Sequence, residues 1–142
     1  VHGNLPLMVS EQCVCGSVLG GRTAQKQCSM PCMKETYALK DRTGARFPLY
    51  MDEHCRMHVF NSKTLNLYKR LEEALKTGAD VLRIEGREQS AEWIGTVTAI
   101  YKKAIDTYNQ TGALITDIAA MQSLDGLAPE GSTYGHYFRG VL

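Results

Sequence analysis

Residues 59–85 read VFNSKTLNLYKRLEEALKTGADVLRIE, and this stretch decides the fold class. It predicts a short strand ending at 59–62, a helix running to about Thr77, and a second strand at 80–85. A helix that leads through a short loop into an apolar strand is half of a repeating β/α unit. The stretch therefore predicts an α/β fold with some parallel strand pairing.

Local signals place the helix within this stretch. Ser62 or Thr64 can cap its start, and Gly78 can end it. One face of the helix is apolar because three leucines recur one turn apart, at Leu67, Leu71 and Leu75. The helix should therefore bury this face in a core.

The chain after residue 85 continues the alternation of strand and helix. Ser90 is predicted to cap a helix that runs to about Asn109, and Gly112 stops it. A shorter helix is predicted from about Thr116 to Leu124. The longer helix has an apolar stripe at helical spacing, formed by Ile94, Val97, Tyr101, Ala104 and Tyr108.

The first 58 residues are predicted to form a strand, a cysteine-bearing loop and a hairpin. The strand at 5–9 is short and apolar, which is typical of a buried strand. The hairpin pairs residues 37–40 with 46–51 around a polar turn that contains Gly44. This hairpin would bring Cys55 back beside Cys28 and Cys32.

Five cysteines lie within the first 55 residues, and four follow the pattern Cys13-x14-Cys28-x3-Cys32-x22-Cys55. Thiols concentrated in one third of a chain indicate ligands of one metal ion or cluster. Four thiolates can bind a 4Fe-4S cluster or a structural zinc, and the single close pair is unlike the usual two-pair zinc signature. Buried free thiols are the alternative. Cys15 is the spare thiol, because an extended segment would point it away from Cys13.

A catalytic cysteine–histidine pair is a competing interpretation, since His54 adjoins Cys55 and His58 follows three residues later. Proximity in sequence does not bring a thiol and an imidazole together. A histidine beside a metal ligand is commonly a hydrogen-bonding neighbour or a surface residue. Metal ligation is therefore the preferred prediction.

Four polar residues are candidate catalytic or substrate-binding groups. Glu85 and Arg87 follow the strand at 80–85, where parallel α/β proteins place functional groups, although they can also pair with each other. His136 and Arg139 lie among aromatic residues and glycines in GHYFRG at 135–140. That segment suits a ligand site and is equally consistent with a packed turn.

The composition limits the classes of partner. The net charge of +1 and the pI of about 7.8 give no strong global attraction to nucleic acid or anionic membrane, although a local basic patch is compatible with them. The apolar stretches are too short to span a membrane, and the odd cysteine count suits a reducing cytoplasm.

Because the chain opens on Val1, we expect a fragment of a larger protein. Several arginines are dispersed and predicted to lie on solvated faces: Arg42, Arg46, Arg56, Arg83 and Arg87.

Seven short strings together resemble the later half of proteins of the peptidase U32 family. They are LMVSEQC at 7–13, Cys28-x3-Cys32, YALKDR at 37–42, Cys55-Arg56, NSK at 61–63, LRIEGR at 82–87 and GHYFRG at 135–140. The resemblance implies a partial TIM-barrel-like α/β fold with a cysteine-rich hairpin and loop insertion. Residues 1–142 would be the C-terminal part of a barrel domain, with the insertion at 1–58, β/α units at 59–142, and the remainder of the barrel as partner.

The resemblance also implies a cofactor and two activities. Some U32 members are collagenase-like proteases, and others support oxygen-independent hydroxylation of ubiquinone precursors or of RNA with a 4Fe-4S cluster held by four cysteines. Carried over to this chain, the cluster ligands are Cys13, Cys28, Cys32 and Cys55. An RNA base or a small aromatic would then be the substrate.

Two alternatives to hydroxylation stay open. A U32-type peptidase has little support from motifs, because the chain contains no Gly-x-Ser-x-Gly turn and no His-Glu-x-x-His pair. A non-enzymatic module stabilised by zinc is the other, and protein prepared in air is expected to be able to carry zinc in place of the cluster.

Overall fold

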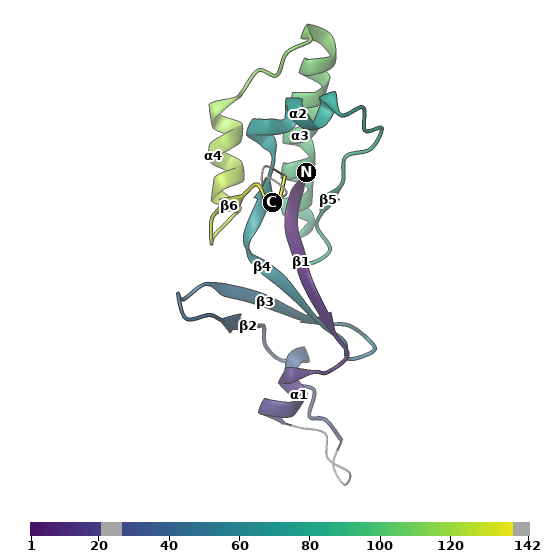
Figure 1. The fold of residues 1–142 in the computed structure, drawn as a ribbon, viewed down its shortest axis with the longest axis vertical. Helices are drawn as coiled ribbons and strands as arrows, with labels where there is room; N and C mark the ends of the chain where they lie inside the picture. The colour runs from purple at the N-terminus through teal and green to yellow at the C-terminus, as the bar shows by residue number, and fades with distance from the viewer. Residues whose placement is uncertain (21–26, 138–142) are drawn as a thin grey trace, which may run out of the picture. The chain divides into compact units, whose positions relative to one another are not determined.

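The computed structural model describes residues 1–20 and 27–137 of the chain (Figure 1). Within these residues the fold is mixed α/β, as predicted. The helices are α1 (Val14–Leu19), α2 (Leu71–Lys76), α3 (Ala91–Thr111) and α4 (Ile118–Gly126), with single 3-10 turns at Pro31–Met33 and Tyr68–Arg70. The strands are β1 (His2–Ser10), β2 (Tyr37–Lys40), β3 (Arg46–Met51), β4 (Met57–Asn66), β5 (Ile84–Glu85) and β6 (Ser132–Thr133).

The described strands form one sheet in the order β2-β3-β4-β1-β5, with β6 paired to β4. The pairs β1–β5 and β4–β6 are parallel, which confirms the predicted parallel pairing. The pairs β2–β3 and β3–β4 are antiparallel, so the sheet is mixed. The barrel-like arrangement implied by the family resemblance stays a prediction.

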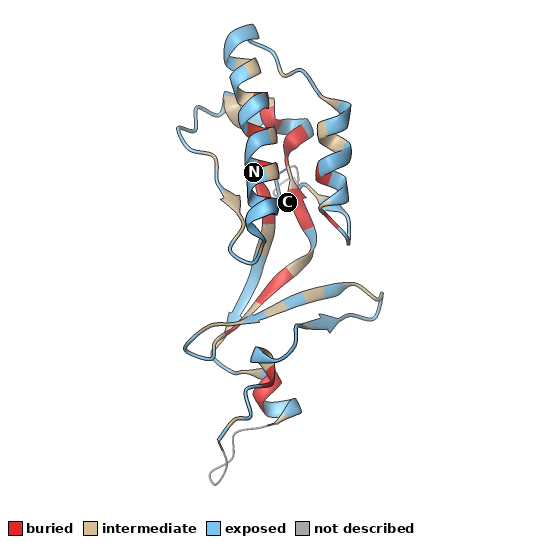
Figure 2. Ribbon diagram, turned by 180° about the vertical axis from the view of Figure 1, so that it is seen from behind, coloured by how far each residue is buried: buried red, intermediate tan, exposed pale blue. Residues whose placement is uncertain are grey.

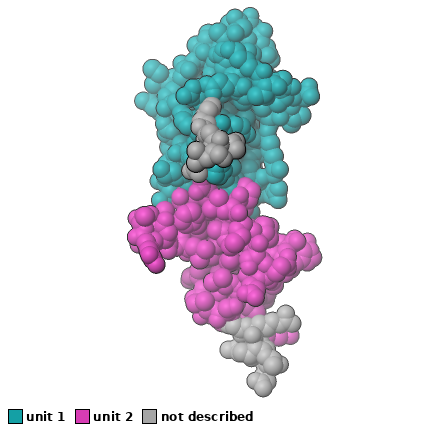
Figure 3. Space-filling model, viewed as in Figure 1, with its two compact units in different colours: residues 1–5, 63–142 teal, residues 6–62 magenta. Residues whose placement is uncertain are grey.

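The chain divides into two compact units, drawn in teal and magenta in Figure 3. Unit 1 comprises Val1–Leu5 and Lys63–Leu142, and unit 2 comprises Pro6–Ser62. All five cysteines belong to unit 2, whereas Glu85, Arg87 and His136 belong to unit 1. The two sets of candidate residues are therefore described separately.

The core of unit 1 lies where helices α2, α3 and α4 pack together. Ser90 caps α3, because its Oγ accepts a hydrogen bond from the Trp93 N–H at 3.1 Å, and Gly112 ends the helix with a φ of 74°. Figure 2 marks buried residues in red. The buried cluster contains Tyr68, Leu71, Trp93, Val97, Tyr101, Ala104 and Leu124. No helix of the described residues is long and apolar enough to cross a membrane.

The helix predicted after residue 62 begins later than expected. Ser62 and Thr64 lie inside β4, which continues to Asn66, and α2 starts only at Leu71 after a 3-10 turn. The cause is non-local: Thr64 pairs with Ser132 of β6, and its N–H donates a 3.1 Å hydrogen bond to the Gly131 carbonyl oxygen. These partners extend the strand through the predicted caps.

Two other predictions about strands need correction. The strand predicted at 80–85 is only Ile84–Glu85, because β1 pairs with it through His2 and Gly3 alone. The strand predicted at 5–9 is longer, spanning His2–Ser10, but its second half is not buried. The described residues leave both faces of this half uncovered, since three consecutive side chains are about half exposed: Leu7, Met8 and Val9.

The α3 stripe is shifted by one position at its start. Ile94 is 39% exposed, whereas its neighbour Trp93 is buried and donates from its indole Nε1 to the Leu127 carbonyl oxygen at 3.5 Å. The remainder of the buried arc follows the predicted spacing through Val97 and Tyr101. The α4 helix begins after Asp117, whose carboxylate accepts hydrogen bonds from two N–H groups of the first turn.

His2 is buried in unit 1 against aromatic rings. Its ring centroid lies 5.5 Å from those of Trp93 and Tyr101, and its Nδ1 lies 3.2 Å from the Tyr101 hydroxyl. Burial lowers the pKa of the imidazole from 6.5 to about 4. The folded protein therefore holds His2 neutral at pH values where an unfolded chain protonates it.

We expect the free energy of unfolding to fall by about 3 kcal/mol between pH 7 and pH 4 because of His2. As the pH drops through 6.5, the unfolded imidazole binds a proton, while the folded one resists until the pH approaches 4. The stabilisation is complete above pH 6.5 and is lost below it. Urea unfolding at successive pH values checks this against a His2→Gln variant. A constant difference between the two proteins over this range would contradict the prediction.

Candidate metal centre and substrate-binding residues

Two of the predicted ligands accept backbone hydrogen bonds through sulfur. Cys13 caps α1, and its Sγ accepts a hydrogen bond from the Gly16 N–H at 3.3 Å. The Cys28 Sγ accepts one from the Met30 N–H at 3.4 Å. Hydrogen bonds of this kind hold the two sulfur atoms in place on the backbone, and sulfur is the atom that binds metals.

Gly16 lies against both of these sulfur atoms. A Cβ atom added to Gly16 would lie 3.6 Å from the Cys13 Sγ and 3.8 Å from the Cys28 Sγ. The absence of a side chain leaves this space open between two thiols that stand fifteen positions apart in the sequence. Gly16 therefore lies beside two thiols that are far apart in the sequence.

The pKa of Cys32 links the four predicted ligands. Burial raises the pKa of this thiol, and the negative charges of the thiolates of Cys13, Cys28 and Cys55 raise it further. Like charges perturb a pKa in this way only at short range. The charges of the other three predicted ligands therefore act on Cys32 in the folded chain.

Cys15 lies closer to this group than its predicted role as a spare suggested. It is buried, and burial together with the charges of Cys13, Cys32 and Cys28 raises its pKa. The prediction assumed an extended segment, but residues 14–19 form α1, so Cys13 and Cys15 occupy the start of one helix. Cys15 adds a fifth thiol beside the four predicted ligands.

Cys55 is presented by a tight turn at 52–56. Its φ of 60° is in the left-handed region, and its N–H donates a hydrogen bond to the Asp52 carbonyl oxygen at 2.9 Å. The Asp52 carboxylate accepts hydrogen bonds from the N–H groups of His54 and Arg56 and from the Arg56 Nε at 2.8 Å. The turn therefore holds an exposed thiol on a fixed backbone.

Asp52 is the residue at this site that sequence reasoning missed. Burial acts to raise its pKa, but hydrogen bonds from His58 and Arg56 outweigh burial and hold the pKa well below its usual range. The ionised carboxylate keeps the turn closed. An aspartate that opens a short polar segment between two strands is a sequence signal for a turn, because its side chain can accept from the N–H group two residues later, and Asp52 could have been found by it.

The two histidines beside Cys55 have carboxylate partners. The Nε2 of His58 lies 3.1 Å from the Asp52 carboxylate, and the Nε2 of His54 lies 3.6 Å from that of Glu53. Neither described imidazole is paired with the Cys55 thiol. The geometry gives no support to the catalytic cysteine–histidine pair.

The described residues, 1–20 and 27–137, contain no group of three His, Cys, Asp or Glu side chains placed to hold a metal ion. The thiols nevertheless share one unit and influence one another's charge. Four cysteine thiolates are the donor set of a 4Fe-4S cluster, and each iron takes one of them. The chemistry of the donors therefore fits such a cluster.

Glu85 and Arg87 pair with each other in unit 1. The Glu85 carboxylate also accepts from the Arg83 guanidinium, and its Oε1 lies 3.3 Å from the Arg87 Nε. These residues lie just after β5 and line an open pocket of about 400 Å3 together with Gly86 and Ile94. The carboxylate is held between two guanidinium groups at the strand end where a site was predicted.

His136 lies exposed in a turn at 134–137, where the Tyr137 N–H donates to the Tyr134 carbonyl oxygen at 3.3 Å. Gly135 has a φ of 61° and packs beside Leu65. The predicted site residue Arg139 lies outside the described residues. The recorded interactions of the described part of the chain do not connect His136 to Glu85 or Arg87.

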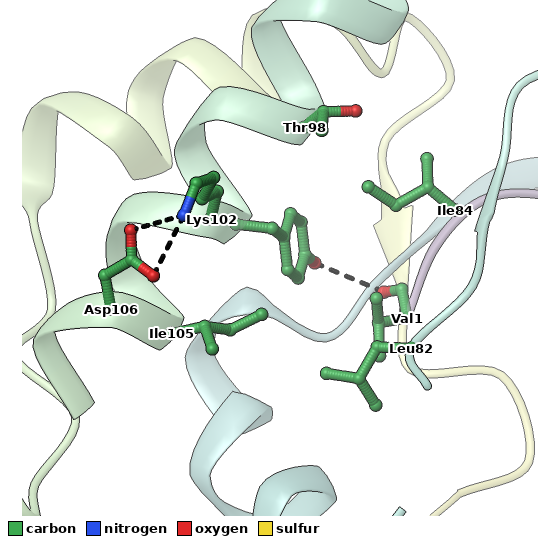
Figure 4. Close-up of a pocket in the computed structure, with 8 residues that line it drawn as sticks. Val1, Leu82, Ile84, Thr98, Lys102, Ile105 and Asp106 are labelled. Atoms are coloured by element: carbon green, nitrogen blue, oxygen red, sulfur yellow. Dashed lines mark hydrogen bonds and ion pairs between the residues drawn. The ribbon is translucent and has the colours of Figure 1, made fainter. Parts of the chain in front are cut away.

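A second pocket, of about 250 Å3, lies between α3 and residues 82–84 (Figure 4). Figure 4 shows Lys102 turned toward Asp106, with which it forms a 2.8 Å ion pair, and the Tyr101 hydroxyl donates to the Val1 carbonyl oxygen at 3.2 Å. The two charged side chains of this pocket are thus engaged with each other, and the other side chains that line it are mainly apolar.

The profile of Peptidase family U32 matches residues 1–141. The "tRNA hydroxylation protein P" of Helicobacter pylori is 29% identical over 98% of this chain and 33% of its own length. The "23S rRNA 5-hydroxycytidine C2501 synthase" of Escherichia coli is 30% identical over 75% of this chain and 15% of its own length. The "Collagenase" of Porphyromonas gingivalis is 26% identical over 75% of this chain and 25% of its own length.

The chain spans a third or less of the length of these relatives. No solved structure matches it at a comparable level of significance. The likeness to each relative is therefore a likeness to one portion of it.

Proposed function

Because the chain belongs to peptidase family U32, we propose that it holds a 4Fe-4S cluster in a protein that hydroxylates an RNA base. The ligands are Cys13, Cys28, Cys32 and Cys55. The observation that carries the proposal is that the sulfur atoms of Cys13 and Cys28, fifteen positions apart in the sequence, both border Gly16. Relatives named for tRNA hydroxylation and for rRNA 5-hydroxycytidine synthesis support RNA as the substrate class.

The chain's own residues prepare the thiols for this role. When bound, a 4Fe-4S cluster supplies one-electron transfer. The N–H groups of Gly16 and Met30 donate hydrogen bonds to the sulfur atoms of Cys13 and Cys28 and hold them in place. Asp52 fixes the turn that presents Cys55. The intact protein would then hydroxylate its substrate with an oxidising co-substrate that donates the oxygen atom in place of molecular oxygen, consistent with the oxygen-independent hydroxylation that the family resemblance implies.

Glu85, Arg87, His136 and Arg139 are the proposed substrate contacts. The Glu85 carboxylate, held by two guanidinium groups, can accept a hydrogen bond from the exocyclic amino group of a base. The Arg87 side chain is 75% exposed and can reach an anionic or carbonyl group. A small aromatic compound is the alternative substrate for the same contacts.

Iron binding is expected to depend on the four ligands and not on Cys15. Protein prepared without oxygen should contain iron and acid-labile sulfide and show a broad visible absorption band, because thiolate-to-iron charge transfer gives these clusters their colour. A Cys28→Ser, Cys32→Ser double variant should lose iron, sulfide and the band. A Cys15→Ser variant is the matched control and should keep all three.

Two results would contradict the cluster. Full iron content in the double variant would show that these thiols do not hold it. Zinc at one ion per chain, with no sulfide, in protein prepared without oxygen would favour the zinc-stabilised module. Elemental analysis with a sulfide assay separates these outcomes.

A collagenase-like peptidase is the second candidate, and the likeness to the Porphyromonas gingivalis collagenase favours it. The two histidines beside Cys55, His54 and His58, lie against carboxylates instead of pairing with its thiol as a base would. Gelatin cleavage by the protein after replacement of all five cysteines with serine would favour the peptidase over cluster chemistry.

A further inference from the structure

The β2–β3 hairpin, whose two strands are labelled in Figure 1, carries three cations at its turn. Lys40 and Arg46 pair directly across the two strands, and Arg42 lies in the turn between them. All three are exposed, and none of them forms an ion pair with another described residue. The carboxylate in the hairpin, Asp41, accepts hydrogen bonds from Thr43 and Ala45 within the turn.

The pairing of Lys40 with Arg46 works against the hairpin. Side chains directly opposite each other on antiparallel strands lie close together, and like charges at such positions are destabilising. No described carboxylate offsets the repulsion by an ion pair. An anionic ligand bound at this end of the hairpin would relieve it.

An exposed aromatic residue shares the face of these cations. Exposure alternates along β3, so Arg46, Pro48 and Tyr50 lie on its exposed face. Tyr50 is 43% exposed, and its ring lies 5.9 Å from that of His58 on the neighbouring strand. It is about 13 Å along the strand from Arg46. Figure 2 shows β2 mainly in the colour of exposed residues and β3 alternating between exposed and intermediate.

Cations followed by an exposed ring along one strand suit a single-stranded nucleic acid. Phosphates bind the cations, and a base stacks on an aromatic ring. We propose that Lys40, Arg42, Arg46 and Tyr50 bind a single-stranded segment of the RNA substrate. This proposal rests on the RNA hydroxylation proposed above and deepens it by assigning the binding surface.

The assignment changes one expectation from the sequence. Arg42 and Arg46 were predicted to be dispersed on a solvated face, whereas the hairpin turn gathers them with Lys40. The small net charge of the chain is compatible with this surface, because acidic residues elsewhere cancel a local basic patch in the sum. Global charge therefore says little about this binding face.

RNA affinity is expected to depend on the hairpin cations. The probes are total tRNA and a single-stranded RNA of about twelve nucleotides, with binding followed by fluorescence anisotropy over a range of salt concentrations. A Lys40→Gln, Arg46→Gln variant should bind at least about tenfold more weakly at low salt. Its slope of log affinity against log salt should fall by about 1.4, which corresponds to two lost phosphate contacts.

Two further variants separate stacking from charge. Tyr50→Ser should bind about tenfold more weakly with an unchanged salt slope, because the tyrosine is neutral. Lys102→Gln, Lys103→Gln removes the same net charge from α3, where both lysines pair with aspartates, and should bind RNA as the parent does. Equal losses in this control and in the hairpin variant would overturn the assignment.

A Lys40→Glu variant tests whether a loss of RNA binding comes from a loss of folding. It places opposite charges across the strands, so the thermal midpoint should be unchanged or higher while RNA binding falls.

A polyglutamate probe that binds as tightly as RNA would overturn RNA as the ligand. Unchanged RNA affinity in the hairpin variants overturns the hairpin assignment alone, whereas no RNA affinity in the parent protein also overturns the RNA substrate proposed above. Iron content should be unaffected by every hairpin variant.

Discussion

A Gly3→Ala variant is expected to lose about 3 kcal/mol or more of folding free energy. Gly3 has a φ of 120°, which residues with an L side chain rarely adopt. An added Cβ would also lie far inside van der Waals distance of the Glu85 carbonyl oxygen. The Ala side chain therefore cannot be accommodated without separating β1 from β5.

The pairing at risk is also the one that positions a proposed substrate contact. Gly3 lies opposite Glu85 in the parallel register of β1 and β5. Urea unfolding gives the free energy, and a Gly95→Ala variant is the control. Gly95 lies inside α3 with no atoms close to its added Cβ, so this change should stabilise the protein by about 0.5–1 kcal/mol. The same sign for both variants would contradict the structure.

A Leu71→Ala variant is expected to cost about 2–5 kcal/mol. Leu71 is fully buried at the start of α2 and belongs to the cluster that contains Tyr68 and Val97. Removing three carbon atoms there takes away apolar burial and leaves a cavity that the surrounding aromatic rings can fill only in part. Chemical denaturation should show a lower midpoint with an unchanged slope.

Ile118→Ala provides the control for this change. Ile118 has the same number of atoms as leucine and lies in the same unit, but it is 70% exposed in α4. Its truncation should change stability by less than about 0.5 kcal/mol. A comparable loss in both variants would show that the core of unit 1 is not centred on Leu71.

Local signals were sufficient for parts of the fold. The hairpin at 37–51 could be predicted because Asp41 and Gly44 determine its turn through contacts within five residues. The α3 helix could be predicted for the same reason, since Ser90 caps it and Gly112 ends it. Such signals depend only on neighbouring residues.

Pairing between distant segments could not be predicted from local signals. Ser62 and Thr64 are good helix caps in isolation, but β6 pairs with Thr64 and keeps it in a strand. The length of β5 likewise depends on how far β1 runs beside it. Such pairing overrides propensity and becomes visible only in the folded chain.

At the candidate metal centre, the sequence pattern predicts a set of four thiols, which stays a prediction, and it did not indicate the backbone that holds them. The spacing of Cys28 and Cys32 is visible in the sequence, whereas the helix that brings Cys15 beside Cys13 was not anticipated. The left-handed backbone at Cys55 was equally hidden, because cysteine has no preference for that conformation. Asp52 imposes it through hydrogen bonds.

The parallel pairs β1–β5 and β4–β6 have a consequence for the time course of folding. Each joins segments from distant parts of the chain, His2 with Ile84 and Thr64 with Ser132. The chain loses conformational entropy in closing such long loops before strand pairing contributes any stabilisation. This order of events slows folding, which is expected to take on the order of milliseconds to seconds. During synthesis, β1 leaves the ribosome long before β5. The edge of β1 that pairs with β5 therefore stays unpaired until β5 follows. The nascent chain therefore passes through a state in which an apolar strand is free to pair with another molecule.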